Sequence, residues 1–206
     1  MERLYNMREL IKMVIVLTIL STLSGGLLAG LRISTAAQIE NQQLKFVKGP
    51  AIKFILEGAS NDPIVDRFKI TDGDIERSFF VGKFNGKANT VAFESFGKGY
   101  GGDVGLMVGV DIENDKIIGV NVTTHSETPG LGANAKDDPS FASQFKGFAI
   151  TEPAKVTTDG GKVNAMSGAT ITSRAVCSAA TDSGKIYQKL KPQITEKLKE
   201  FEQKGD

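Results

Sequence analysis

The feature that most constrains this chain is an uncharged, apolar run near its N-terminus. Nineteen consecutive positions, residues 13–31, contain no Asp, Glu, Lys or Arg. As a helix rising 1.5 Å per residue, this run would span about 28 Å, close to the ~30 Å hydrocarbon core of a bilayer. The sequence therefore predicts one transmembrane helix, with residues 13–31 embedded in the membrane.

A cleaved signal peptide is the alternative interpretation of the same run. The apolar part of a signal peptide is normally about 7–15 residues long and ends at small residues. Thr35-Ala36-Ala37 has the composition of such a cleavage site. The run is longer than a signal peptide requires, and this length favours an anchor that stays in the mature protein.

The charges that flank the run predict its orientation. Basic residues at positions 3, 8 and 12 precede it, and Arg32 follows it. Because positive charge is retained on the cytoplasmic side, we expect the N-terminus in the cytoplasm and the C-terminal part outside. This topology describes a single-pass protein of the cell (inner) membrane with an extracytoplasmic, or periplasmic, C-terminal domain.

Composition excludes several function classes. The 25 Lys and Arg residues nearly balance the 24 Asp and Glu residues, so the net charge of +1 gives no electrostatic reason to expect a nucleic-acid partner. Cys177 and His125 are the one cysteine and the one histidine. They can build neither an internal disulfide nor a structural zinc site, so we expect no metal ligands. Cys177 is expected to be a small core residue.

Two β-hairpins are predicted after residue 76. Residues 78–84 and 90–95 flank Asn85-Gly86, the pair that favours a two-residue hairpin turn. Residues 103–110 and 116–124 are rich in valine and isoleucine and form the second pair.

Helices are predicted on both sides of these strands. Residues 35–60 form amphipathic pieces broken at Gly49-Pro50, Asp138 caps a short helix, and a longer helix follows Thr170 and ends at Pro192. The fold class is therefore α+β, an antiparallel sheet flanked by helices. The predicted divisions are a cytoplasmic N-terminus and anchor (1–32), a juxtamembrane stalk (33–75) and an extracytoplasmic domain (76–206).

Three glycine-rich stretches lie where strands or loops end: residues 97–102, 127–132 and 167–170. The third opens the long predicted helix. Free backbone N–H groups and the dipole at a helix N-terminus favour a phosphate, and Gly168 lets the backbone approach it closely. The alternative is that the hydroxyl residues here only cap the helix.

Two of these stretches together resemble the FMN-binding domain family. They are Ser-Gly-Ala-Thr-Ile-Thr-Ser at residues 167–173 and Glu-Thr-Pro-Gly-Leu-Gly at residues 127–132. The resemblance covers roughly residues 90–190 and the N-terminal anchor. It implies a covalently bound FMN, held by a phosphoester on the hydroxyl of Thr170. Asn164 stands where family members often carry an aspartate.

The residues also indicate how the rest of the flavin would be held. Pro129 stiffens the second stretch, Gly130 and Gly132 admit a flat ring close to the backbone, and Leu131 covers its face. Tyr100 is either a further contact or part of a tight loop between strands. The expected FMN site comprises Thr170, Ser167, Gly168, Ala169, Thr172, Glu127, Thr128, Pro129, Gly130, Leu131, Gly132 and Tyr100. His125 lies on the same side of its segment as Glu127, where it steadies charge on the flavin or makes a loop hydrogen bond.

The resemblance also implies a function and partners. It is greatest to components of ion-translocating ferredoxin:NAD oxidoreductase complexes of the Rnf type, and next to those of sodium-translocating NADH:quinone reductases. It implies an electron-carrying redox subunit without independent catalysis. The expected partners are the other membrane subunits and a flavin transferase that uses FAD, because no base beside Thr170 activates its hydroxyl. The alternative from another class is a cofactor-free extracytoplasmic assembly or binding module.

Overall fold

The computed structural model describes residues 2–203 and divides into two units, residues 1–43 and 44–206. The first unit is the helix α1 (Glu2–Gln43). It contains a 30-residue segment, Met7–Ala36, that is long and apolar enough to cross a membrane. Within it the Thr18 and Thr22 hydroxyls donate to backbone oxygens four residues earlier, each at 2.8 Å, which satisfies them without water. The predicted apolar helix is confirmed.

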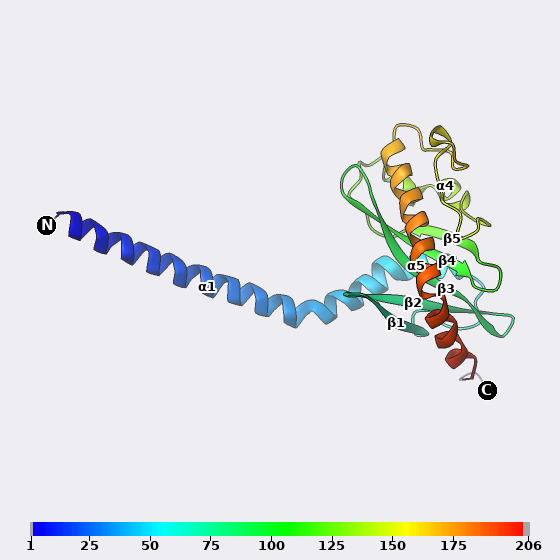
Figure 1. Ribbon diagram of the computed structural model, residues 1–206, viewed down its shortest axis with the longest axis horizontal. Helices are drawn as coiled ribbons and strands as arrows, with labels where there is room; N and C mark the ends of the chain where they lie inside the picture. The colour runs from blue at the N-terminus through cyan, green and yellow to red at the C-terminus, as the bar shows by residue number, and fades with distance from the viewer. Residues whose placement is uncertain (1, 204–206) are drawn as a thin grey trace. The chain divides into compact units, whose positions relative to one another are not determined.

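The second unit is built on a five-stranded sheet in which each strand pairs with its sequence neighbour (Figure 1). All four pairings are antiparallel. The α+β fold class predicted from the sequence is therefore confirmed. The strands are β1 (Arg67–Asp72), β2 (Ile75–Phe84), β3 (Lys87–Lys98), β4 (Asp103–Asp111) and β5 (Lys116–Val122).

Both predicted hairpins are present. Asn85 (φ 53°) and Gly86 (φ 79°) form the turn between β2 and β3, in the left-handed conformations that a two-residue turn of this kind requires. The strand β1 was not predicted, and it lies within the range assigned to the stalk. Residues 44–75 thus contribute to the folded unit, whose boundary in the structure is at residue 44.

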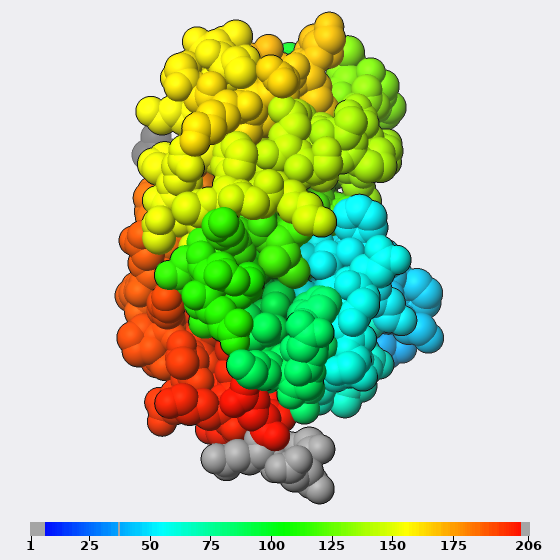
Figure 2. Space-filling view, turned by 90° about the vertical axis from the view of Figure 1, so that its right-hand side faces the viewer, coloured from blue at the N-terminus to red at the C-terminus, as the bar shows by residue number. Residues whose placement is uncertain are grey.

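The sheet is covered on both faces by helices. The long helix α5 (Thr170–Gln203) contacts β3 and β4, and α2 (Gly49–Ile55) contacts β4 and β5. Figure 2 shows residues 44–56 and α5 on opposite sides of the strands. The short elements are η1 (Leu44–Lys48), α3 (Asn134–Asp137), α4 (Pro139–Ser143) and η2 (Thr157–Asp159).

Each face of the sheet has its own apolar cluster. On the α5 side, Phe79 stacks on Phe68 with ring centroids 5.4 Å apart and lies 5.1 Å from Phe93. On the α2 side, Ile52 and Met107 are fully buried in a smaller cluster. Burial of such side chains contributes about 1.5–3 kcal/mol each, so α2 is part of the domain core rather than a free stalk.

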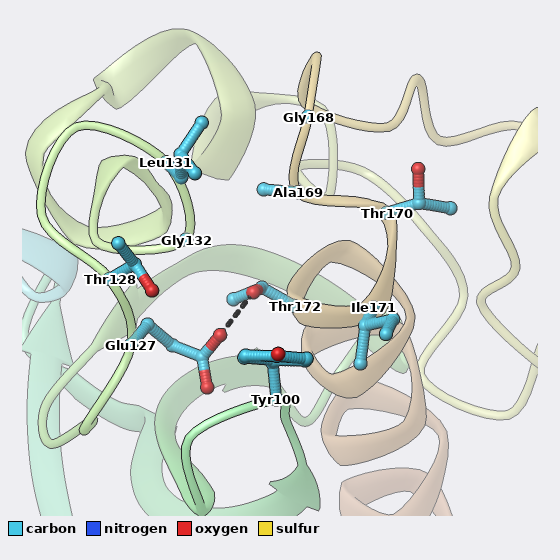
Figure 3. Close-up of a pocket in the computed structure, with 10 residues that line it drawn as sticks. All are labelled: Tyr100, Glu127, Thr128, Leu131, Gly132, Gly168, Ala169, Thr170, Ile171 and Thr172. Carbon is cyan, nitrogen blue, oxygen red and sulfur yellow. Dashed lines mark hydrogen bonds between the residues drawn. The ribbon is translucent and has the colours of Figure 1, made fainter.

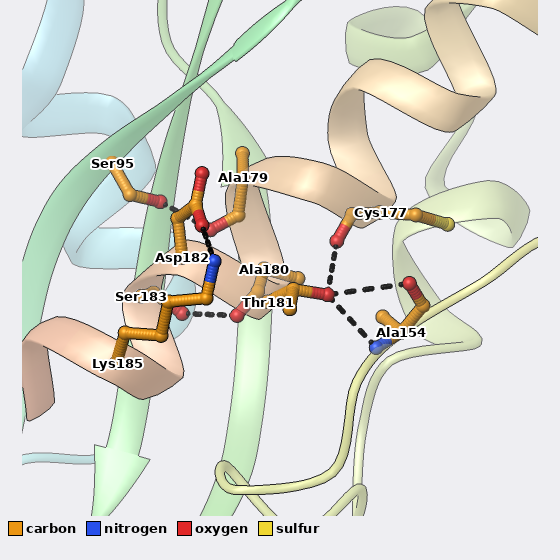
Figure 4. A network of polar contacts seen from close by, with 9 residues as sticks. All are labelled: Ser95, Ala154, Cys177, Ala179, Ala180, Thr181, Asp182, Ser183 and Lys185. Atoms are coloured by element: carbon orange, nitrogen blue, oxygen red, sulfur yellow. Dashed lines mark hydrogen bonds and ion pairs between the residues drawn. The ribbon is translucent and has the colours of Figure 1, made fainter. Parts of the chain in front are cut away.

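Close packing and specific hydrogen bonds set the position of α5 on the sheet. A Cβ on Gly97 of β3 would overlap the backbone carbonyl of Ala175. Ser95 Oγ donates to the carbonyl of Ala179 at 2.8 Å, and Thr181 Oγ1 accepts from Ala154 N at 3.0 Å (Figure 4). These contacts fix the rotation and height of the helix, and therefore the place of its N-terminus.

Pro192 does not end the long helix, contrary to the sequence prediction. Proline lacks the N–H that would continue the hydrogen-bond ladder, yet α5 runs on to Gln203. Ile194 and Leu198, beyond the proline, are buried in the α5-side cluster, and Phe201 lies against Phe68. Burial of this last apolar face outweighs the loss of one hydrogen bond.

The turn between β4 and β5 is tied to α5 by Asp115. Its carboxylate accepts hydrogen bonds from Tyr187 Oη at 2.5 Å and Lys191 Nζ at 2.6 Å. The hydrogen bonds from Lys191 and Tyr187 hold the pKa of Asp115 below its ordinary value. A lowered pKa stabilises the fold above the pKa of the unfolded chain, about 3.9, and this contribution is lost as the pH falls through the folded pKa.

We expect Asp115→Asn to have a lower free energy of unfolding than the wild type at neutral pH. The gap between the two free energies should become smaller as the pH falls from about 5 to 3. Urea unfolding of the detergent-solubilised chain, followed by circular dichroism across this pH range, measures the gap. Glu113→Gln, in the same turn, is the control and should keep the wild-type pH dependence. A gap that stays constant down to pH 3 would contradict the role of Asp115.

Candidate functional site

Three segments converge around one cavity (Figure 3). The turn between β3 and β4 is closed by a hydrogen bond from Gly99 N to Gly102 O at 2.8 Å and places Tyr100 at its tip. The loop after β5 carries residues 127–132, and the loop of residues 167–169 leads into α5. Tyr100 therefore lies in a tight loop between strands, one of the two alternatives that the sequence offered, and its side chain also lines the cavity.

The three segments enclose a cavity of about 510 Å³, within the usual range for small-molecule sites. It brings together most of the predicted site residues and adds Ile171, which the sequence analysis missed. Ser167, Pro129 and Gly130 do not line it; they belong to the turns that shape the loops. The lining residues are Tyr100, Glu127, Thr128, Leu131, Gly132, Gly168, Ala169, Thr170, Ile171 and Thr172.

Glu127 joins all three segments. Its side chain is buried, with 7% of the residue exposed. Thr172 Oγ1 of α5 donates to Glu127 Oε2, and Gly101 N donates to Oε1 at 2.8 Å. Burial raises the pKa of Glu127, but the hydrogen bonds from Thr172 and from the backbone of Gly101 and Tyr100 outweigh it and hold the pKa below its ordinary value. The carboxylate is therefore ionised at neutral pH.

Gly132 provides the space that this arrangement needs. A Cβ at Gly132 would lie 2.5 Å from Thr172 Oγ1 and 2.6 Å from Glu127 Oε2. Contacts this short would push apart the two side chains that link the loop to α5. Glycine is therefore required here by close approach, and its absence of a side chain leaves the wall of the cavity open to a flat group.

Ser173 holds the loop before α5 in place. Its hydroxyl donates to Ala169 O at 2.9 Å and accepts from Met166 N at 3.0 Å, so one buried side chain bridges both ends of the turn. Gly168 within this turn has a φ of +72°, which favours glycine. The turn presents Thr170 as the first residue of α5, half-buried at the edge of the cavity.

The site is suited to a phosphorylated ring compound. The first N–H groups of a helix lack partners within the helix and carry a partial positive charge, which favours a phosphate at Thr170. The volume, the apolar side chains of Leu131 and Ile171 and the open wall at Gly132 suit a flat ring. These residues therefore fit FMN. Within residues 2–203, no group of three or more His, Cys, Asp or Glu side chains is arranged to hold a metal ion.

The remaining residues singled out in the sequence have local roles. His125 Nδ1 accepts a hydrogen bond from Glu127 N at 3.3 Å, as expected of a loop histidine. Cys177 is buried, as predicted, and burial raises the pKa of its thiol to about 11. Asn164 is exposed, and its backbone N–H donates to Gln144 Oε1 at 2.7 Å.

Residues 99–184 match the FMN-binding domain. NqrC from Shewanella oneidensis has a similar structure, with a TM-score of 0.50 and 25% sequence identity over 67% of this chain and 72% of that chain. The match to the FMN-binding domain includes the β3–β4 turn, the loop after β5 and the first turns of α5, so it covers the whole cavity. Residues 99–184 of this chain are therefore similar in sequence to an FMN-binding domain.

Relatives of this chain match it over most of its length. The G subunit of the ion-translocating oxidoreductase complex of Methanosarcina acetivorans is 30% identical over 174 residues, covering 84% of this chain and 91% of the relative. The G subunit of the proton-translocating ferredoxin:NAD(+) oxidoreductase complex of Clostridium ljungdahlii is 32% identical over 163 residues, covering 78% of this chain and 82% of the relative. The chain belongs to the family formed by the G subunits of these complexes.

Proposed function

We propose that this protein is a membrane-anchored electron carrier that holds FMN through a phosphoester on Thr170 Oγ1. The ring then lies in the cavity against residues 127–132, with Tyr100 at its edge. The carrier works within an Rnf-type ferredoxin:NAD oxidoreductase complex. The flavin supplies the redox chemistry, and the protein supplies its position and electrostatic surroundings.

One observation carries this proposal: Thr170 is half-buried at the first position of α5, at the edge of the cavity formed by the two motif-bearing loops. A hydroxyl at that point can bear a phosphate that the helix N-terminus stabilises. The attachment fixes only the phosphate end, so the walls of the cavity must orient the ring. Because the link is covalent, the cofactor is not lost by dissociation outside the cytoplasm.

The attachment chemistry balances with FAD as the donor. Thr170 Oγ1 forms a bond to the phosphorus of the FMN half, the pyrophosphate bond breaks, and AMP leaves. The hydroxyl proton passes to a base of the flavin transferase, because a threonine hydroxyl has no useful nucleophilicity without one. The transferase is thus a partner in maturation.

The topology of the proposal follows from the charges around α1. Basic residues at positions 3, 8 and 12 precede the uncharged run of residues 13–31, and Arg32 alone follows it directly. This bias supports a cytoplasmic N-terminus and an FMN-binding domain outside the cell (inner) membrane. A single span has no ion route of its own, so ion movement belongs to the other membrane subunits. Isolation of the intact complex and identification of its co-purifying subunits tests this assignment.

Mass analysis of the native chain tests the attachment. The chain is purified from cells that also express the flavin transferase and is then digested. We expect the peptide containing Thr170 to carry the mass of FMN less one water, with fragmentation locating the group on Thr170. An unmodified peptide from transferase-containing cells would overturn the proposal and leave a membrane-tethered binding module.

A further inference from the structure

We infer that the Glu127 carboxylate acts as a fixed negative charge in the wall of the FMN pocket and lowers the reduction potential of the bound flavin. The inference rests on the proposed function, because it concerns FMN attached at Thr170. It gives Glu127 a role in redox tuning that is separate from its role in joining the loops.

The hydrogen-bond partners of Glu127 do not neutralise its negative charge. Its partners, the Thr172 hydroxyl and the backbone N–H groups of Gly101 and Tyr100, are neutral donors. Neutral donors stabilise an ionised carboxylate without cancelling its charge, whereas a salt bridge would. His125, on the same loop, contributes to the lowered pKa of Glu127. Its Nδ1 accepts a hydrogen bond from the Glu127 backbone N–H.

Glu127 lies in the part of the cavity where the flavin ring is expected, so its charge is close to the ring. Figure 3 shows Glu127 and Thr128 on the side of the cavity away from Thr170. With the phosphate held at Thr170, the rest of the cofactor extends toward that side. The Glu127 side chain is buried, so little water separates its charge from a ring that fills the cavity.

The physical effect has a definite sign. Reduction adds electrons to the ring, and a nearby fixed anion makes that addition less favourable. A unit charge within about 4–6 Å changes the equilibrium of a neighbouring ionisable group by tenfold or more in a partly buried site. We therefore expect removal of the Glu127 charge to raise the ratio of reduced to oxidised flavin about tenfold at a fixed electrode potential.

Glu127→Gln tests the inference in the flavinylated, detergent-solubilised full chain. The amide keeps the shape of the side chain and one oxygen to accept from Gly101 N, but it lacks the charge. Spectroelectrochemical titration measures the ratio of reduced to oxidised flavin in each variant. Glu113→Gln, in the β4–β5 turn, removes the same charge elsewhere in the domain and is the matched control.

Thr172→Val separates charge from structure. It removes the hydroxyl that donates to Glu127 Oε2 and keeps the carboxylate charge. A purely structural role predicts that both variants shift the ratio of reduced to oxidised flavin in the same way. Fixed-charge tuning predicts a higher ratio for Glu127→Gln. It predicts a lower ratio for Thr172→Val, because the carboxylate keeps its charge and loses a donor, and an unchanged ratio for Glu113→Gln.

Three results would overturn the inference. They are a ratio for Glu127→Gln within twofold of the wild type, an equal rise for Thr172→Val, and an equal rise for Glu113→Gln. If Glu127→Gln shows no cooperative unfolding, Thr172→Val decides: a lower ratio supports the inference, and an unchanged or higher ratio overturns it. A wild-type chain without covalent flavin overturns the proposed function itself, which fluorescence of the denatured chain reveals before any titration.

Discussion

Thr170→Ala is expected to abolish covalent flavin attachment while leaving the domain folded. The proposed phosphoester needs the Oγ1 atom, and alanine has none. Thr170 is the first residue of α5, where even the loss of a capping hydroxyl would cost only about 1 kcal/mol. This is small against the roughly 5–15 kcal/mol by which domains are usually stable. A denaturing gel under ultraviolet light should show a fluorescent wild-type band and a dark Thr170→Ala band.

Thr170→Ser provides the matched control for this experiment. Serine keeps the hydroxyl at the same backbone position, so its band is expected to fluoresce. All variants must be made in cells that express the flavin transferase, because its absence also leaves the band dark. Urea unfolding of each variant shows whether the fold is retained. A Thr170→Ala band at wild-type intensity would exclude Thr170 as the attachment point.

The strands that the sequence predicted are those whose signals are local. Asn85-Gly86 specifies a tight turn by its own backbone preferences. The strand β1 lacked such a signal, because only Ile70 of its six residues is buried. It is an edge strand whose existence depends on pairing with β2, and that pairing is not visible in its own composition.

The same distinction applies to the helices. The start of α5 could be predicted from hydroxyl residues before an apolar periodic segment. Its continuation past Pro192 could not, because it depends on the burial of Ile194 and Leu198 against strands far away in sequence. A local rule about proline was overridden by tertiary packing, which the sequence pattern beyond the proline only partly indicated.

In the site, motifs predicted which segments meet but not which side chains face the cavity. Residues 127–132 and 167–172 both contribute to the lining, yet Pro129, Gly130 and Ser167 do not. Their role is to form the turns that direct their neighbours inward. Ile171 was missed because the direction of a side chain in the first turn of a helix depends on how that helix packs.

The placement of Thr170 depends on the packing of α5 against β3, and Gly97→Ala is expected to disrupt it. The added Cβ would overlap the Ala175 carbonyl and lie 3.1 Å from Ala179 N. Both are backbone atoms, so the helix as a whole must shift. Overpacking of a core costs about 1–3 kcal/mol and occasionally more, and we expect about 3 kcal/mol here. The melting temperature should fall by about 6–12 °C.

Gly119→Ala is the matched control, because the same substitution in β5 would bring a Cβ no closer than 3.9 Å to Ile55. That distance is ordinary van der Waals contact, and alanine reduces the freedom of the unfolded chain, so we expect stability equal to the wild type or higher by up to about 1 kcal/mol. Thermal unfolding of the detergent-solubilised chain, followed by circular dichroism, compares the two variants. Equal stability of Gly97→Ala and Gly119→Ala would show that α5 can move without loss. The close contact at Gly97 would then not be what holds Thr170 beside the cavity.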